Sequence, residues 1–173
     1  MPATARCVVH QANNDGVPLH ASCTLTWSQQ AGVDVKDADG HPSAPQATRL
    51  STFWCSFLHT EQQWLHVSGD AGLLELDDFV IAKSKDQADF YKVRYAWGDR
   101  ARSIDMHRET ITVDGNQETL MWEAFGRLCD SGTVAERDFW MQVSLQTQTI
   151  IDALMASAAA DGAAVALAPI PVI

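Results

Sequence analysis

Three side chains with metal-binding chemistry lie close together in the sequence, namely Cys55, His59 and His66. Thiolate and imidazole groups are the ligands that zinc prefers in proteins. Their spacing matches none of the Cys and His repeats that are typical of zinc sites. We therefore predict no metal site here, and we interpret both histidines as ordinary surface or half-buried residues.

Asp77 and Asp78 are two adjacent carboxylates, a residue type that can carry acid–base chemistry. They fall at the end of an expected strand, where successive side chains point to opposite faces. Such a pair is poorly placed to share one proton transfer. We predict turn or capping roles for both.

The acidic stretch from Asp37 to Gly40 has a hint of a calcium loop. In the register of a helix–loop–helix calcium site, Val35 would be the first ligand and Gln46 the twelfth. Neither side chain supplies the carboxylate that these positions require. We interpret this stretch as a solvated acidic turn.

Motifs for nucleotide binding and for nucleophilic catalysis are missing from the sequence. It contains no GxGxxG, no phosphate-binding P-loop and no GxSxG. The glycines of the Gly69–Gly72 turn lack the strand–glycine–helix setting that a dinucleotide needs. We therefore predict that this chain alone binds no cofactor.

Composition narrows the class of protein. The 173 residues carry a formal net charge of −10, and 46% of them are hydrophobic. This charge argues against nucleic-acid and anionic-membrane partners, because both need clustered Lys and Arg. No apolar run approaches the ~20 residues of a membrane span. We expect a cytoplasmic protein whose four cysteines are reduced and buried, namely Cys7, Cys23, Cys55 and Cys129.

The first two thirds of the chain read as strands. Between Leu19 and Trp27, apolar and polar residues alternate with a period of two. The segment 49–57 is apolar on both faces, which predicts a strand near the middle of a sheet. Turn residues at 13–16 and 69–72 predict two hairpins. The expected strands are 5–10, 19–27, 49–57, 64–68, 73–81, 91–97, 108–113 and 163–167.

The last third changes to helical spacing. Leu120, Ala124, Phe125 and Leu128 predict a first helix that ends before Gly132. A second helix is expected to begin near Asp138 and to end at Asp161-Gly162. Its apolar stripe comprises Trp140, Val143, Thr147, Ile150, Ile151, Leu154 and Ala158.

Strands followed by helices indicate an α+β fold. We predict an open, predominantly antiparallel sheet with two C-terminal helices packed on one face. We expect residues 1–173 to form a single domain, in which 32–46 is a flexible hairpin loop rich in Asp, Gly and Pro. The aromatic run from Tyr91 to Trp97 either packs on the helices or forms an interface.

Several strings of this sequence, in their order and spacing, resemble the C-terminal domain of the Gfo/Idh/MocA oxidoreductases. That family includes glucose–fructose oxidoreductase and dihydrodiol dehydrogenase. The matching strings are TFWCSF at 52–57, WLHVSGDAGLLELDDF at 64–79, EAF at 123–125 and TQTIIDALMASA at 147–158. The resemblance spans most of the chain, from about Pro2 to Leu167.

The resemblance implies an NAD(P)-dependent oxidoreductase that acts on a sugar, polyol or diol. In this family a separate Rossmann domain holds the cofactor and a Glu-Lys-Pro string with the catalytic lysine. This sequence has neither, so no catalytic residue is carried over. The family's sheet shapes the substrate pocket on one face and forms dimer contacts on the other. Phe79 and Ile81 match the region near substrate, although core packing is the simpler interpretation of both.

Two functions remain open from the sequence. The chain is either the substrate-pocket and dimerisation domain of such an oxidoreductase, which needs a Rossmann-domain partner, or a standalone, non-catalytic dimerisation or binding module. Both imply a homodimer through the sheet face. NADPH binding and the oligomeric state of the purified chain distinguish the two.

Overall fold

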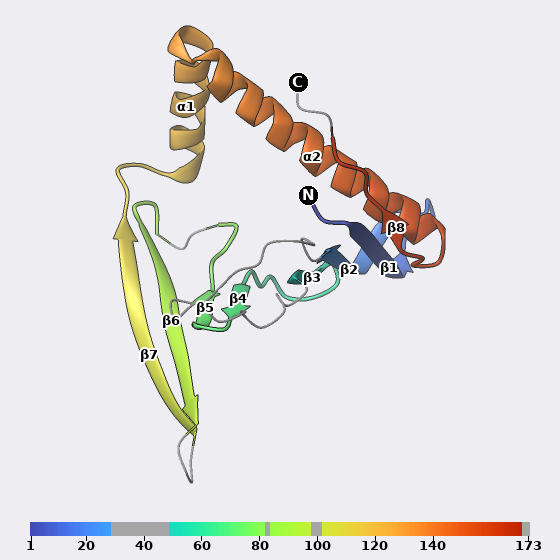
Figure 1. The fold of residues 1–173 in the computed structure, drawn as a ribbon, viewed down its shortest axis with the longest axis horizontal. Helices are drawn as coiled ribbons and strands as arrows, with labels where there is room; N and C mark the ends of the chain where they lie inside the picture. The colour runs from blue at the N-terminus through green and yellow to red at the C-terminus, as the bar shows by residue number, and fades with distance from the viewer. Residues whose placement is uncertain (29–48, 82–83, 98–101, 171–173) are drawn as a thin grey trace, which may run out of the picture. The chain divides into compact units, whose positions relative to one another are not determined.

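A computed structural model describes residues 1–28, 49–81, 84–97 and 102–170 (Figure 1). Within these residues the fold is α+β, with two open antiparallel sheets and two helices near the C-terminus. The predicted fold class is therefore confirmed, with the strands divided between two four-stranded sheets. The expected loop at 32–46 and the acidic turn at 37–40 lie outside the described residues.

The chain divides into two compact units. The first combines Met1–His59 with Thr133–Ile173, and the second is Thr60–Gly132. The first unit holds strands β1 (Thr4–Ala12), β2 (Pro18–Trp27), β3 (Arg49–Ser56) and β8 (Val165–Ala166), and helix α2 (Val134–Ala159). Its strands follow the order β3-β2-β1-β8.

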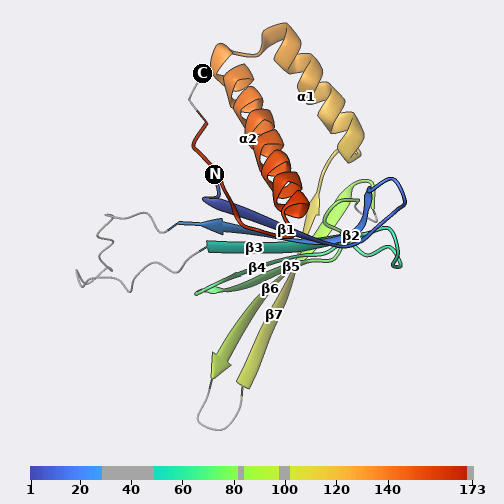
Figure 2. The same ribbon diagram turned by 90° about the vertical axis from the view of Figure 1, so that its right-hand side faces the viewer.

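Strands β1 and β2 form because of their alternation and their turn. The side-chain oxygen of Asn13 accepts hydrogen bonds from the backbone N–H groups of Asp15 and Val17, and Gly16 has a φ of 81°. This predicted hairpin is confirmed. Helix α2 lies over this hairpin, as Figure 2 shows. The core comprises Ala5, Cys7, Ala21, Cys23, Ala153 and Leu154.

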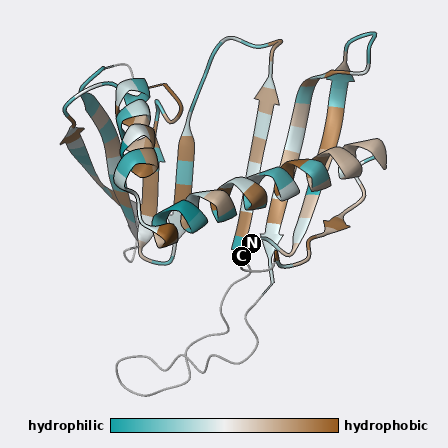
Figure 3. Cartoon of the chain, turned by 90° about the horizontal axis from the view of Figure 1, so that it is seen from above, coloured by the Kyte–Doolittle hydropathy of each residue, from teal (hydrophilic) through white to brown (hydrophobic). Residues whose placement is uncertain are grey.

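Helix α2 begins one turn before the predicted start at Asp138, so that prediction was wrong. Thr133 and Glu136 form a capping box, in which each side chain bonds the other residue's backbone N–H. The helix contacts the sheet near its C-terminal end, through Ala153, Leu154 and Ser157. Figure 3 shows that hydrophobic and hydrophilic residues alternate along the length of α2.

The predicted apolar stripe of α2 is therefore buried only in part. Leu154 lies in the core, and Ile150 and Ala158 pack against it. Trp140 and Ile151 are exposed, at 54% and 46%.

Strand β3 differs from its predicted place. It stands at the end of its sheet rather than in the middle, and Leu50, Phe53 and Trp54 are exposed. The expectation of four buried cysteines also fails in part. Cys7 and Cys23 are buried, whereas Cys55 and Cys129 are exposed, and all four are free thiols.

The second unit holds β4 (Leu65–Gly69), β5 (Gly72–Leu76), β6 (Gln87–Trp97), β7 (Arg102–Thr112) and α1 (Gln117–Ser131). The strands follow that order in an antiparallel sheet. Gly72 makes the predicted tight hairpin, with a φ of 145°. Strand β5 ends at Leu76, five residues before the predicted end, whereas β7 starts earlier than predicted.

The first helix is confirmed at its predicted place, with Asn116 as its N-cap. None of its residues is buried. In the aromatic run, Val93 is only 1% exposed, so one member of the run is core. The side chains of Tyr95 and Trp97 lie outside the described part. No helix in the described residues is long and apolar enough to cross a membrane.

Candidate functional site

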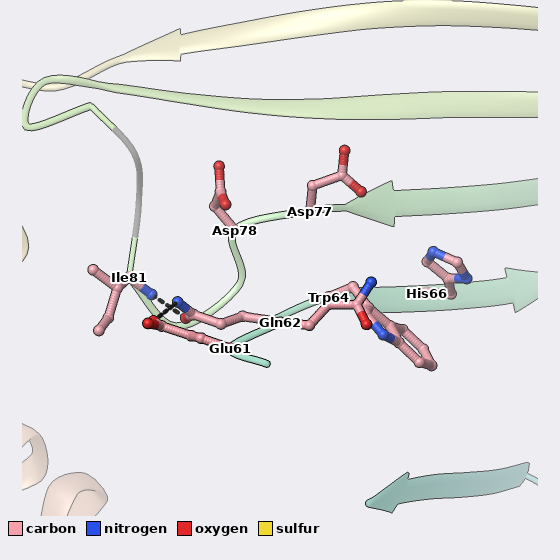
Figure 4. A pocket seen from close by; sticks show the side chains of 8 residues that line it. Glu61, Gln62, Trp64, His66, Asp77, Asp78 and Ile81 are labelled. Atoms are coloured by element: carbon pink, nitrogen blue, oxygen red, sulfur yellow. Dashed lines mark hydrogen bonds between the residues drawn. The ribbon is translucent and has the colours of Figure 1, made fainter. Parts of the chain in front are cut away.

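A pocket of about 760 Å³ lies at the open end of the β4–β5 hairpin, inside the second unit (Figure 4). This volume is typical of a small-molecule site. Its lining combines carboxylate, amide, imidazole and aromatic groups with one aliphatic side chain. The lining residues are Glu61, Gln62, Gln63, Trp64, His66, Asp77, Asp78 and Ile81.

The hairpin register brings the two ends of this lining together. Leu65 pairs with Leu76 at the open end of the hairpin. The residues just outside that pair, Trp64 and Asp77, therefore emerge on neighbouring strands. Both line the pocket. At the other end of the hairpin, Gly72 approaches β6 so closely that a Cβ atom there would lie 2.7 Å from the carbonyl oxygen of Val93.

Gln63 fastens the two chain segments beyond the hairpin. Its backbone forms an isolated parallel bridge with Asp78. Its side-chain oxygen accepts a hydrogen bond from the backbone N–H of Ile81 at 2.7 Å. Its side-chain nitrogen donates to Glu61 Oε1 at 3.2 Å. These bonds hold the loop after β5 beside the segment before β4.

Asp77 and Asp78 lie beyond the end of β5, Asp77 in a bend and Asp78 in the isolated bridge to Gln63. The rule that neighbouring strand residues face opposite sides therefore does not apply to them. In Figure 4 both carboxylates project in the same direction. Their predicted separation to opposite faces was wrong, because the strand ends before them.

The pocket suits a neutral ligand with several hydroxyl groups. Carboxylate oxygens accept hydrogen bonds from hydroxyls, and amide side chains both donate and accept. The Trp64 ring lies beside His66, with centroids 4.9 Å apart, and offers an apolar surface. Among the described residues that line the pocket there is no Lys or Arg. Three carboxylates without a lining cation disfavour an anionic ligand.

Asp77 and Asp78 also border a smaller hollow of about 310 Å³. On its wall the Arg108 guanidinium donates to Asp89, and the Thr110 hydroxyl donates to the same carboxylate at 2.6 Å. These hydrogen bonds lower the pKa of Asp89, and the same contact raises the pKa of Arg108. This wall therefore carries a neutralised ion pair.

The two site residues carried by the resemblance have different positions. Ile81 lines the larger pocket, next to its bond to Gln63. Phe79 does not line it. Both side chains are exposed, at 62% for Ile81 and 53% for Phe79, so neither is packed in a core.

The histidines considered for a metal site have aromatic neighbours instead. His59 accepts or donates a hydrogen bond with Ser56 at 2.7 Å and stacks edge-on against Trp54 and His20. His10 lies on the other side of His20, with centroids 4.8 Å apart. His66 lies beside Trp64 in the pocket. In the part of the chain that the structure describes, no group of three side chains is arranged to hold a metal ion.

The polar run Glu61-Gln62-Gln63 lines the pocket but was not predicted to be part of a site. The predicted hairpin was the sequence signal that could have found it. A polar run directly before one strand and an acidic pair directly after its antiparallel partner must meet at the open end. The Gln63 bond to Ile81 spans 18 residues and has no sequence signature.

Comparisons with known proteins identified no relative of this chain. No protein-family model matches the chain, and no curated protein matches it. The site therefore rests on its own geometry, and the likeness to the oxidoreductases rests on the sequence strings alone.

Proposed function

We propose that this chain is the substrate-pocket and dimerisation domain of a Gfo/Idh/MocA-like oxidoreductase that acts on a sugar, polyol or diol. The observation that carries the proposal is the place of the longest resembling string, 64–79. It forms the β4–β5 hairpin, and its two ends line the pocket of about 760 Å³. A substrate-shaping role accounts for hydroxyl-binding groups at this position.

A second string supports the same assignment. The segment 147–158 forms the end of α2 that packs on β1. Its Ser157 is fully buried, and its hydroxyl bonds both β1 and the chain after the helix. This string therefore contains a residue that joins α2 to β1 and to the segment after the helix.

The proposed division of labour leaves the redox step to another domain. A nicotinamide cofactor, NAD or NADP, would supply hydride transfer when bound to a separate Rossmann domain. The residues of this chain would orient the substrate. Asp77, Asp78 and Glu61 would accept hydrogen bonds from substrate hydroxyls, and the Trp64 ring would cover an apolar face of the sugar.

Ligand-observed NMR tests the pocket directly. With D-glucose and myo-inositol as probes, we expect saturation transfer from the purified chain. Asp77→Asn and Trp64→Ala should each reduce that transfer several-fold. Glu118→Gln is the matched control, because Glu118 is an exposed acidic residue on α1 that does not line the pocket. Equal transfer from Asp77→Asn, Trp64→Ala and the parent chain would contradict the assignment of the pocket.

A turnover assay tests the division of labour. The purified chain, mixed with myo-inositol and NAD or NADP, should give no absorbance change at 340 nm. Turnover by this chain alone would show that it holds its own cofactor site, against the proposal. Addition of a cognate Rossmann domain should restore turnover.

Dimerisation is the second part of the proposal. Ile104 and Met106 lie two residues apart on β7, so they share one face, and both are more than half exposed. In sedimentation velocity we expect a dimer that Met106→Glu dissociates. Ile111→Glu is the control, because Ile111 is also exposed but lies on the opposite face of β7.

The standalone module is the alternative function. Adjacent exposed apolar side chains on α1 favour it, because a contiguous exposed apolar patch marks an interaction surface. On α1 alone Met121, Trp122 and Phe125 are all more than half exposed. A stable dimer that shows no saturation transfer to either probe would select this alternative. Under either function we propose a cytoplasmic location, which the free thiols of the described cysteines support.

A further inference from the structure

Cys7 and Cys23 face each other across the β1–β2 hairpin. They are directly paired in the antiparallel register, and their sulfur atoms are 3.3 Å apart. Both side chains are 6% exposed and point into the core under α2. Two thiols in sulfur–sulfur contact are more than a pair of small apolar fillers, because they can form a covalent bond.

The backbone around Cys7 shows which type of cross-strand pair this is. The Cys7 N–H donates to Ser157 Oγ at 2.9 Å, so it points away from β2. Cys7 and Cys23 are therefore a non-hydrogen-bonded pair, whose Cα atoms are about 4.5 Å apart. A disulfide spans Cα separations of about 4.4–6.8 Å. Bond formation needs the sulfur contact of 3.3 Å to shorten to about 2.05 Å.

We propose that Cys7 and Cys23 form a reversible cross-strand disulfide in the folded protein. In the step that forms it, each thiol loses its hydrogen and the two sulfurs join. Two electrons and two protons pass to an oxidant, which is a disulfide or a diazene such as diamide. With diamide, the N=N bond takes up both hydrogens and becomes a hydrazine. A dithiol reductant reverses the step.

The surroundings set the rate of this reaction. Burial and the contact with Cys7 raise the pKa of the Cys23 thiol to about 12. The thiolate is the reactive form, so oxidation is slow at neutral pH and accelerates as the pH rises. In a reducing compartment the pair remains a dithiol, and the bond records exposure to an oxidant.

Cys55 is the competing partner. It pairs with Ala21, two residues from Cys23 on β2, so Cys55 and Cys23 share a face on adjacent strands. Cys55 is exposed, whereas Cys7 is buried. The direct contact between Cys7 and Cys23 nevertheless favours their bond, because a diagonal cross-strand pair is farther apart.

Peptide mapping after oxidation distinguishes these bonds. Trypsin cleaves after Arg6 and Lys36, so Cys7 and Cys23 fall in one peptide, while Cys55 falls in another. The native chain is treated with diamide, then unfolded in urea with iodoacetamide so that every remaining thiol is alkylated, and digested. We expect the peptide 7–36 to lose two hydrogens and to carry no alkyl group. The variant with Cys55→Ser and Cys129→Ser should behave identically, and Cys7→Ser should not form the bond.

Thermal unfolding gives an independent readout. The oxidised double variant should unfold about 5 °C or more above its reduced form, since the bond restricts the unfolded chain. Chain that is unfolded in urea and oxidised in parallel is the positive control for the oxidant. If that control forms a disulfide while peptide 7–36 from the natively treated chain carries two alkyl groups, the proposal is overturned. A bond between Cys23 and Cys55 would overturn it as well.

Discussion

The Ser157 hydroxyl accepts a hydrogen bond from the Cys7 backbone N–H, 2.9 Å away, although 150 residues separate the two along the chain. The same hydroxyl donates to the Ala163 carbonyl oxygen at 2.6 Å. One side chain thus joins β1, α2 and the segment that leads to β8. Ser157 is fully buried, and it is the one buried polar residue in the described part of the chain.

Ser157→Ala should lower the free energy of unfolding by about 1–3 kcal/mol, because the buried Cys7 N–H and the partly buried Ala163 carbonyl oxygen lose their partner. Urea unfolding followed by circular dichroism measures the change. Ser144→Ala is the control: its hydroxyl is exposed and bonds only the Trp140 carbonyl oxygen of its own helix. Equal stability of the two variants would contradict the role of Ser157.

Gly72→Ala should destabilise the second unit by about 1–3 kcal/mol. The φ of 145° is unfavourable for any residue with a Cβ, and that Cβ would lie 2.7 Å from the Val93 carbonyl oxygen. Gly69→Ala, at the other end of the same turn, should change stability little, because nothing lies within 4 Å of its Cβ. Urea unfolding of both variants should show the loss only for Gly72→Ala.

Thr133→Ala removes half of the capping box of α2. The Thr133 side chain bonds the Glu136 N–H at 3.2 Å, and the Glu136 side chain bonds the Thr133 N–H at 2.8 Å. We expect a loss of about 1 kcal/mol in the free energy of unfolding. Thr149→Ala, in the middle of the same helix, should cost nothing, because Ala is the better helix former. A larger loss for Thr149→Ala would show that the cap does not limit the helix.

The Cys23 thiol gives stability a pH dependence in the alkaline range. Its pKa is 9.0 in the reference state and about 12 in the folded chain, so the folded state holds this proton more tightly. The contribution of this proton to the free energy of unfolding is fully present below pH 9.0 and is lost as the pH rises toward 12. Over that range the free energy of unfolding falls by up to about 1.4 kcal/mol per pH unit. Unfolding at pH 8 and pH 10 measures the slope. Cys23→Ala should have a shallower slope, and an unchanged slope would refute this origin.

Local patterns carried the parts of the fold that were predictable. The alternation between Leu19 and Trp27 and the Asn13–Gly16 turn each involve only near neighbours, and both gave the right structure. The hairpin at Gly69–Gly72 followed from backbone chemistry alone. The position of β3 at the end of its sheet could not be predicted in this way, because a pattern with two apolar faces does not determine which strands lie beside it.

The candidate site was only partly readable for the same reason. Ile81 was named through the resemblance, and Asp77 and Asp78 through their chemistry. The two carboxylates were expected inside a strand, on opposite faces, because the predicted end of that strand was five residues too late. The hydrogen bond from the Ile81 backbone N–H to the Gln63 side chain joins residues 18 positions apart, and it depends on tertiary packing rather than on a local sequence pattern.

The first unit is assembled from two stretches of chain with the whole second unit between them. Strands β1 to β3 are therefore synthesised long before the end of α2 that covers them. At about 5–20 residues per second, the ribosome needs roughly 5–20 s to make the intervening ~100 residues. The second unit, by contrast, has neighbouring strands in sequence order and can fold as it emerges. During translation the apolar face of β1 and β2 therefore remains exposed until the end of α2 has been synthesised. In this interval the nascent chain most needs protection from aggregation.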